Sequence, residues 1–265
     1  MADVIYVYGL VRRGFDGQRI PAGLDDAGVT VLDSAGFHAL ASRLSDDDYS
    51  ATTVSEKSGD LTWLSPRALA HDRVLTWAQE HGGVIPFPMF SLFSGQAALD
   101  ASLHERAEAL HRAFARVRDA DEFGVRAHRR DSVMMQVIDQ LDDNIGRLRA
   151  DAADATPGQR YLLDRKIAEQ SKAALRSAGQ RIAREVFERL KARSRAAVSR
   201  PLVPDADRAN EATMVLNGAF LVDHASTTDF RGAVSEVIRE FEPKGITFEF
   251  TGPWPPYNFV SGDAA

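Results

Sequence analysis

The sequence predicts an α+β protein of two domains, each a small sheet covered by helices, with a long antiparallel helical hairpin inserted in the second. Two patterns carry this prediction. Apolar and polar residues alternate over 122–130, which is typical of a half-exposed strand and opens a second set of elements. Two long stretches of helical periodicity then follow within 131–195, joined by a short turn. The 265 residues suffice for two domains, which we place at 1–120 and 121–265.

The elements of the first domain follow from its apolar spacing and its turn-forming residues. Residues 4–11 are apolar on both alternating faces and rich in β-branched side chains, which is typical of a buried central strand. Ser65-Pro66 predicts a helix start, because serine caps helices and proline suits their first position. The other expected elements are a loop at 14–26, short strands at 28–33 and 36–43, a mobile surface loop at 45–60, a short strand at 84–87 and an amphipathic helix at 95–118.

The second domain is predicted in the same way. Thr156-Pro157 restarts a helix after the hairpin turn, and Ser226 to Asp229 caps a later one. In chain order we expect a strand at 122–130, a helix at 131–150, a helix from 157 to about 195, a polar break at 194–210, a strand at 213–223, a helix after 226 and a strand at 246–251.

Composition excludes several classes of protein. Apolar residues make up 44% and charged residues 26%, so the chain can bury a core. The net charge, 32 − 38 = −6, argues against a dedicated nucleic-acid binder. The chain has no cysteine, which removes disulfides, thiolate metal sites and a cysteine nucleophile. No apolar run approaches the roughly 20 residues that span a bilayer, and the N-terminus lacks signal-peptide features. The sequence therefore predicts a soluble cytoplasmic protein with no membrane partner.

Polar residues supply no catalytic or metal constellation. His104 and His111 lie two helical turns apart, too far to share one metal without further ligands. Residues 46–48, three aspartates, fit a solvated acidic turn better than a cation site. Asp223-His224 resembles an acid–base pair, but no nucleophile is coupled to it. We expect no enzyme activity, no metal and no cofactor.

Two apolar segments stand out instead. Residues 86–93 combine three Phe, one Met and two Pro, which fits either a buried connection or an aromatic surface for a hydrophobic partner. Residues 252–260 contain three prolines that favour an extended, polyproline-like tail, and Trp254, Tyr257 and Phe259 supply its anchors. Such a tail docks on its own protein or on a partner.

The tail is also where a family resemblance begins. Residues 252–259, Gly-Pro-Trp-Pro-Pro-Tyr-Asn-Phe, resemble the C-terminal signature of the gas vesicle protein L/F family (GvpL/GvpF). Further matches occur in the same order along the chain, at 6–11, 84–87, 122–126, 160–166 and 216–223. The chain departs from the family pattern at Pro88-Met89-Phe90, where many members carry arginine, phenylalanine and glycine.

The resemblance implies a non-enzymatic accessory protein of gas vesicle assembly with two ferredoxin-like-variant domains. Its implied partner is the small hydrophobic shell protein, of GvpA type, which it would hold before assembly or help to nucleate; other gas vesicle accessory proteins are further implied partners. We place this contact on the first domain, and the tail residues Trp254, Tyr257 and Phe259 between the domains. The side chains that we assign to the contact are Tyr6, Tyr8, Phe87, Met89, Phe90 and Phe93.

A function of another class stays open at this stage. Ferredoxin-like domains host many activities, so a small-molecule enzyme or sensor is the alternative. It would need a polar cleft, for which Asp223, His224 and Arg126 are the candidates. A monomer is expected.

Overall fold

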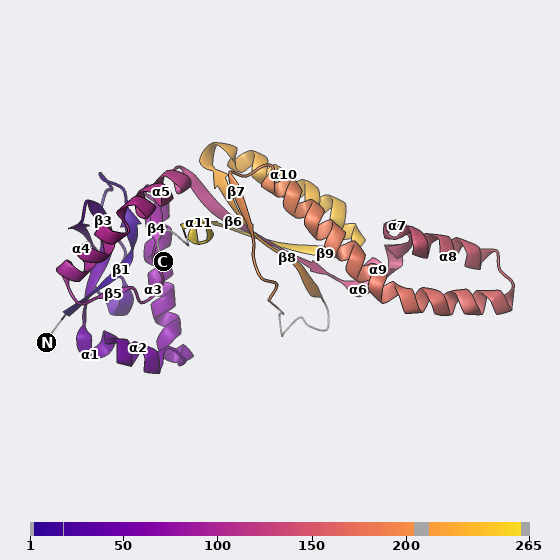
Figure 1. Ribbon diagram of the computed structural model, residues 1–265, viewed down its shortest axis with the longest axis horizontal. Coiled ribbons are helices and arrows are strands. Elements are labelled where there is room, and N and C mark those ends of the chain that lie inside the picture. Colours follow the sequence, from indigo (N-terminus) through magenta and orange to yellow (C-terminus); the bar gives the residue numbers. More distant parts are fainter. Residues whose placement is uncertain (1–2, 18, 204–211, 261–265) are drawn as a thin grey trace. The chain divides into compact units, whose positions relative to one another are not determined.

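The computed structural model describes residues 3–17, 19–203 and 212–260 of the chain. They form two compact units, and each has its own antiparallel sheet and helices (Figure 1). The first unit contains the chain up to Glu122 and the segment from Pro253 on, and the second is Phe123–Gly252. Residues 204–210 of the expected polar break lie outside the described residues.

The sheet of the first unit has the strand order β2-β3-β1-β4, and β5 also pairs with β1. Its strands are β1 (Asp3–Val11), β2 (Thr30–Ser34), β3 (Phe37–Ser45), β4 (Val84–Pro86) and β5 (Leu92–Phe93). The central strand is β1, as its apolar pattern predicts, and it is buried from Val4 onward. Ala35 and Gly36, both at positive φ (49° and 84°), form the tight turn between β2 and β3.

Helices bury β1 on both faces. Tyr6, Tyr8 and Val11 pack with Val74 and Leu75 of the long helix α3 (Leu61–Glu80). The alternate side chains of β1 point to the opposite face and are also buried. The remaining helices of this unit are α1 (Asp46–Tyr49), α2 (Ala51–Lys57), α4 (Gln96–Glu105), α5 (Ala107–Val117) and α11 (Tyr257–Val260).

The second unit has a ferredoxin-like plan. Its sheet has the order β7-β8-β6-β9, and the chain runs strand, helices, strand, strand, helix, strand. The elements are β6 (Ala120–Arg129), β7 (Ala196–Ser199), β8 (Thr213–Asp223), α10 (Thr227–Phe241) and β9 (Ile246–Trp254). The strands of the first unit are arranged in the same order as those of the second, but no long helix lies between its first two strands. The predicted α+β class with two ferredoxin-like variants is therefore confirmed.

In chain order, the hairpin is inserted between β6 and β7, and it projects beyond the sheet of this unit (Figure 1). Its return arm is the long helix α9 (Pro157–Lys191), which begins at Thr156-Pro157 with a capping box, as predicted. The outgoing arm is not the single helix expected over 131–150. It divides into α6 (Asp131–Met134), a 3-10 turn, α7 (Ile138–Leu141) and α8 (Asp143–Ala153). Asp142 breaks the arm because its side chain accepts hydrogen bonds from the backbone N–H groups of Asn144 and Ile145.

Other local predictions are wrong for similar reasons. The expected loop at 45–60 contains α1 and α2, because Ser50 caps α2 by accepting from the N–H of Thr53. The helix expected from Ser65 begins at Leu61, capped by Asp60. The helix expected over 95–118 divides into α4 and α5 at Arg106.

The polar break also contains β7, and the tail is not extended throughout because Tyr257–Val260 form a helical turn. Among the described residues, no helix combines the length and apolar character needed to cross a membrane.

Candidate functional site

Three of the side chains assigned to a partner surface belong to the core of the first unit. Tyr6 and Tyr8 are completely buried and Phe87 is 2% exposed. Tyr6 and Tyr8 face α3, because the alternation of β1 directs them there. The prediction that these three contact a partner is therefore corrected, since no partner reaches them while this unit is folded.

A buried polar network connects that core to the loop that follows β4. The Tyr6 hydroxyl lies 2.7 Å from Nδ1 of His71 on α3, and it accepts a hydrogen bond from the N–H of Phe90 at 3.4 Å. His71 is also hydrogen-bonded to the backbone of Phe87. The N–H of Phe87 in turn donates to the carbonyl of Tyr8 at 2.9 Å. Tyr6 and His71 thus hold the loop from both of its ends.

Burial sets the protonation state of this network. Desolvation lowers the pKa of His71 from 6.5 to about 4. The hydrogen bond to the backbone of Phe87 acts in the opposite direction but is the smaller effect. Burial likewise raises the pKa of Tyr6 far above its ordinary value. Both groups are therefore neutral near pH 7, as a buried hydrogen-bonded pair requires.

The loop presents Phe90 in an unusual backbone conformation. Its φ is 65°, in the left-handed region that favours glycine over a bulky residue. The Phe90 ring stacks on Trp63 of α3, with centroids 5.4 Å apart and planes 19° apart, and it meets Tyr6 edge-on. An aromatic residue thus occupies a backbone conformation that favours glycine, with its ring against Trp63.

Beside this loop lies an apolar cavity of about 510 Å³, which we call the aromatic groove. Its apolar lining is Val4, Tyr49, Ala51, Val54, Phe90, Leu92 and Phe93. Phe90, Leu92 and Phe93 are half-buried, so their rings and methyl groups are partly open to solvent. Leu92 and Phe93 form β5, which pairs with Ile5 and Tyr6 of β1. The groove therefore places apolar side chains at an edge of the sheet.

The structure brings together part of the predicted surface and adds to it. Phe90 and Phe93 line the groove, whereas the half-buried Met89 is not part of its lining. Tyr49 and Val54 were missed because their segment was interpreted as a loop. The pair Ser50 and Thr53 is a local signal for the start of α2, the helix that carries Val54; Tyr49 ends the preceding helix α1.

Hydroxyl and acidic groups rim the groove. Asp46, Ser50, Ser55 and Ser94 complete the lining, and Asp47 and Asp48 are exposed beside Asp46 in the first turn of α1. Within the described parts of the chain, no group of three or more histidine, aspartate or glutamate side chains could hold a metal ion. The rim is polar, and the floor is apolar.

The C-terminal tail is attached to the first unit. Buried Glu122 accepts hydrogen bonds from both the backbone N–H and the side-chain amide of Asn258. Arg116 of α5 donates to the carbonyl of Phe259, which is itself buried. Tyr257 packs on the core of this unit, and Trp254 is 39% exposed. The domain limits predicted from the sequence place the tail in the second domain, whereas these contacts lie in the first unit. That the tail links the two domains stays a prediction.

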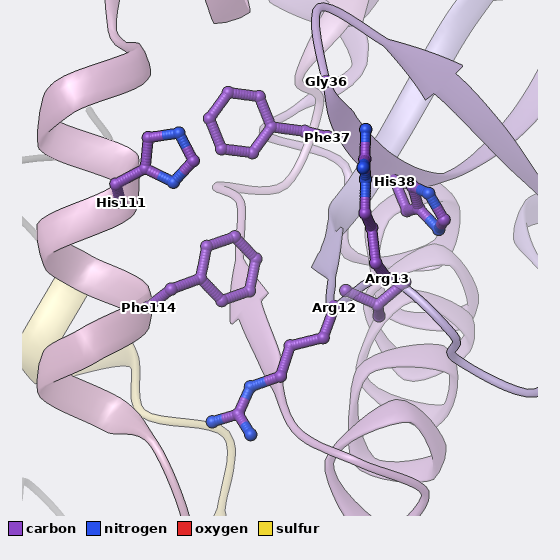
Figure 2. A pocket seen from close by; sticks show the side chains of 8 residues that line it. Arg12, Arg13, Gly36, Phe37, His38, His111 and Phe114 are labelled. Carbon is purple, nitrogen blue, oxygen red and sulfur yellow. The ribbon is translucent and has the colours of Figure 1, made fainter.

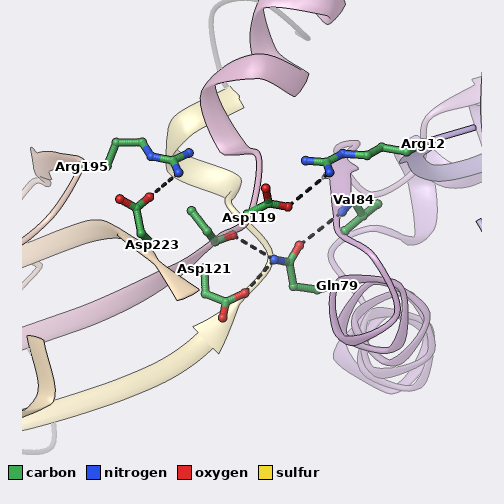
Figure 3. A network of polar contacts seen from close by, with 8 residues as sticks. Arg12, Gln79, Val84, Asp119, Asp121, Arg195 and Asp223 are labelled. Atoms are coloured by element: carbon green, nitrogen blue, oxygen red, sulfur yellow. Dashed lines mark hydrogen bonds and ion pairs between the residues drawn. The ribbon is translucent and has the colours of Figure 1, made fainter. Parts of the chain in front are cut away.

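Polar contacts also hold the chain just after α5 (Figure 3). Gln79 of α3 donates to the carbonyl of Ala120 at 3.1 Å and to the carboxylate of Asp121 at 2.7 Å, and it accepts from the N–H of Val84. Arg12 pairs with Asp119 at 3.3 Å. These bonds all lie within the first unit and hold the residues that follow α5.

Two of the three polar residues considered for a cleft in the second unit, Asp223 and Arg126, are engaged in ion pairs. Asp223 pairs with Arg195, as Figure 3 shows, and Arg126 of β6 lies 3.6 Å from Glu249 of β9. His224 follows β8 in a 3-10 turn. Asp223 and Glu249 are thus each paired with an arginine.

Together these features define a class: a protein of two ferredoxin-like units with an apolar groove on the first. Comparison with known proteins identifies the family within this class. Residues 4–261 match the family described as gas vesicle synthesis protein GvpL/GvpF, and the chain belongs to this family.

Individual relatives and a solved structure are also gas vesicle proteins of the L or F type. Gas vesicle protein L of Streptomyces sp. (strain CB03234) is 26% identical over 96% of this chain and 92% of its own length. Gas vesicle protein L1 of Halobacterium salinarum is 24% identical over 90% of this chain and 83% of its own. The crystal structure of GvpF from Anabaena sp. PCC7120 matches the fold with a TM-score of 0.74 at 16% identity, over 98% of both chains.

Proposed function

We propose that this chain is a non-enzymatic accessory protein of gas vesicle assembly, which binds the small hydrophobic shell protein in the aromatic groove of its first unit. Binding would prevent aggregation of the shell protein, help to nucleate the vesicle, or both. Membership of the family supports the gas vesicle role. We place the protein in the cytoplasm, associated with the vesicle.

The aromatic groove is the observation that carries the proposal. A shell subunit must expose apolar surface before it polymerises, and such surface aggregates unless it is covered. Phe90, Leu92 and Phe93 offer apolar contacts at an edge of the sheet, and aromatic side chains are enriched in the cores of interfaces. The net charge of −6 favours solubility of the resulting complex.

Affinity measurements with three variants test the proposal. Leu92→Ser with Phe93→Ser removes the edge contacts, and Phe90→Gly removes one ring while relieving its positive φ, so the fold is kept. Leu162→Ser is the matched control, because Leu162 is 65% exposed on α9 of the other unit. Truncation of a central interface anchor costs about 2 kcal/mol, so we expect roughly 30-fold weaker binding of purified shell protein by the groove variants and unchanged binding by the control. Unchanged affinity of folded groove variants would refute this placement.

A further inference from the structure

The first unit has a second cavity, of about 490 Å³, at the C-terminal end of β1. Apart from Val11 and Gly36, the residues that line it are aromatic or basic. Figure 2 shows them: Arg12, Arg13, Phe37, His38, His111 and Phe114. None of these residues lines the aromatic groove.

The aromatic wall is built by the β2–β3 turn and by α5. The turn at Ala35-Gly36 starts β3 with Phe37, which is 5% exposed and therefore fixed. His111 and Phe114 project from one face of α5 toward Phe37 (Figure 2), as residues three apart on a helix do. The rings of Phe37 and Phe114 are nearly parallel, 10° apart, with centroids at 6.4 Å, and the His111 ring lies 4.9 Å from that of Phe37.

The basic side chains come from the end of β1 and the start of β3. Arg12 pairs with Asp119 at 3.3 Å, and His38 lies 3.0 Å from the carboxylate of Asp33. Arg13 differs from both, because its exposed side chain has no hydrogen bond or ion pair within the described segments of the chain. The cavity thus offers an uncompensated guanidinium, although the whole chain carries a net charge of −6.

We propose that this cavity binds a small anion that carries a planar aromatic ring, of the class represented by nucleoside monophosphates and aromatic carboxylates. The ring packs against Phe37 and Phe114, and the anion pairs with Arg13. The volume lies within the range of about 300–1,000 Å³ that is usual for small-molecule sites. Arginine suits the anion because its planar fork matches phosphate and carboxylate oxygens. This site is independent of the function proposed for the aromatic groove.

Calorimetric titration of the full chain tests the ligand class. The probes are AMP, 2-naphthoate, adenosine and inorganic phosphate, so that ring and anion are offered together and apart. We expect AMP or 2-naphthoate to bind with a Kd below about 1 mM, and adenosine and phosphate at least about tenfold more weakly. Which of the first two binds more tightly distinguishes a phosphate ligand from a carboxylate. Absence of binding by both at about 1 mM would overturn the proposal.

Variants test the placement. Arg13→Gln removes the free guanidinium from an exposed position, and Phe114→Ala removes one ring. Because a hydrogen bond to a charged group is among the stronger ones, Arg13→Gln should weaken binding of the better probe by roughly 10-fold or more. Arg43→Gln is the control, because Arg43 is an exposed arginine of β3 outside the cavity. If Arg13→Gln and Arg43→Gln bind the better probe with equal affinity, the proposed site is contradicted. This comparison does not depend on whether Phe114→Ala folds.

Discussion

Buried His71 makes the stability of the first unit depend on pH. Its pKa is lowered from 6.5 to about 4 in the folded chain, so between these values the unfolded chain binds a proton that the folded chain does not. The contribution of His71 to stability is therefore fully present above pH 6.5 and is lost as the pH falls from 6.5 to 4. The difference of 2.5 pKa units corresponds to about 3 kcal/mol at full extent, and to roughly 2 kcal/mol between pH 7 and pH 4.5.

The assay is urea unfolding at pH 7 and at pH 4.5, followed by tryptophan fluorescence. Trp63 and Trp77 lie on α3 of the first unit, and Trp254 is the last residue of β9, so two of the three tryptophans report the first unit directly. His71→Gln keeps an acceptor and a donor but cannot be protonated. We expect it to be less stable than the natural chain at pH 7 and to lose roughly 2 kcal/mol less on acidification.

An exposed histidine provides the control, since carboxylates also titrate in this range. His104→Gln, on the exposed face of α4, should leave the pH dependence unchanged. If the natural chain and His71→Gln lose the same free energy of unfolding between pH 7 and pH 4.5, the reasoning about the buried network is refuted.

Three further substitutions follow from backbone geometry and from the tail. Ala35→Asn, at the left-handed first position of the β2–β3 turn, should stabilise the first unit by about 0.5–1 kcal/mol, seen as a higher urea midpoint; a lower midpoint contradicts the turn assignment. Gly9→Ala should destabilise it by about 1–3 kcal/mol, because a Cβ there would lie 2.5 Å from the carbonyl oxygen of Ile85, whereas Gly28→Ala meets no atom within 4 Å and should be close to neutral. Asn258→Ala should cost about 1–3 kcal/mol by leaving the buried carboxylate of Glu122 without these bonds, and should speed proteolysis of the tail; unchanged stability and cleavage would show that the tail is held by other contacts.

Elements with a strong local signal could be predicted from the sequence. Thr156-Pro157 predicts the start of α9, because a capping box and a first-turn proline act within four residues. The apolar run of β1 indicates its central place, because a strand buried on both faces needs apolar side chains on both. Interruptions were missed where a single side chain diverts the backbone, as Asp142 does by capping α8.

The candidate site was only half predictable. Aromatic composition at 86–93 indicated an apolar surface, and Phe90 and Phe93 do line the groove. Composition does not tell which side of a strand or loop faces the core, so Phe87 was assigned to the surface although it is buried. The positive φ of Phe90 depends on tertiary hydrogen bonds from residues far away in the sequence, such as the one that Tyr6 accepts. No local pattern contains that information.

Site-specific photo-crosslinking tests the central claim, that the aromatic groove contacts the shell protein, most directly. A photoreactive benzoylphenylalanine replaces Phe93 in the groove or, as a control, Leu162 on α9, and each chain is irradiated with purified shell protein. We expect a crosslinked complex with the shell protein for Phe93→benzoylphenylalanine and none for Leu162→benzoylphenylalanine. A complex formed from position 162 and not from position 93 would contradict it.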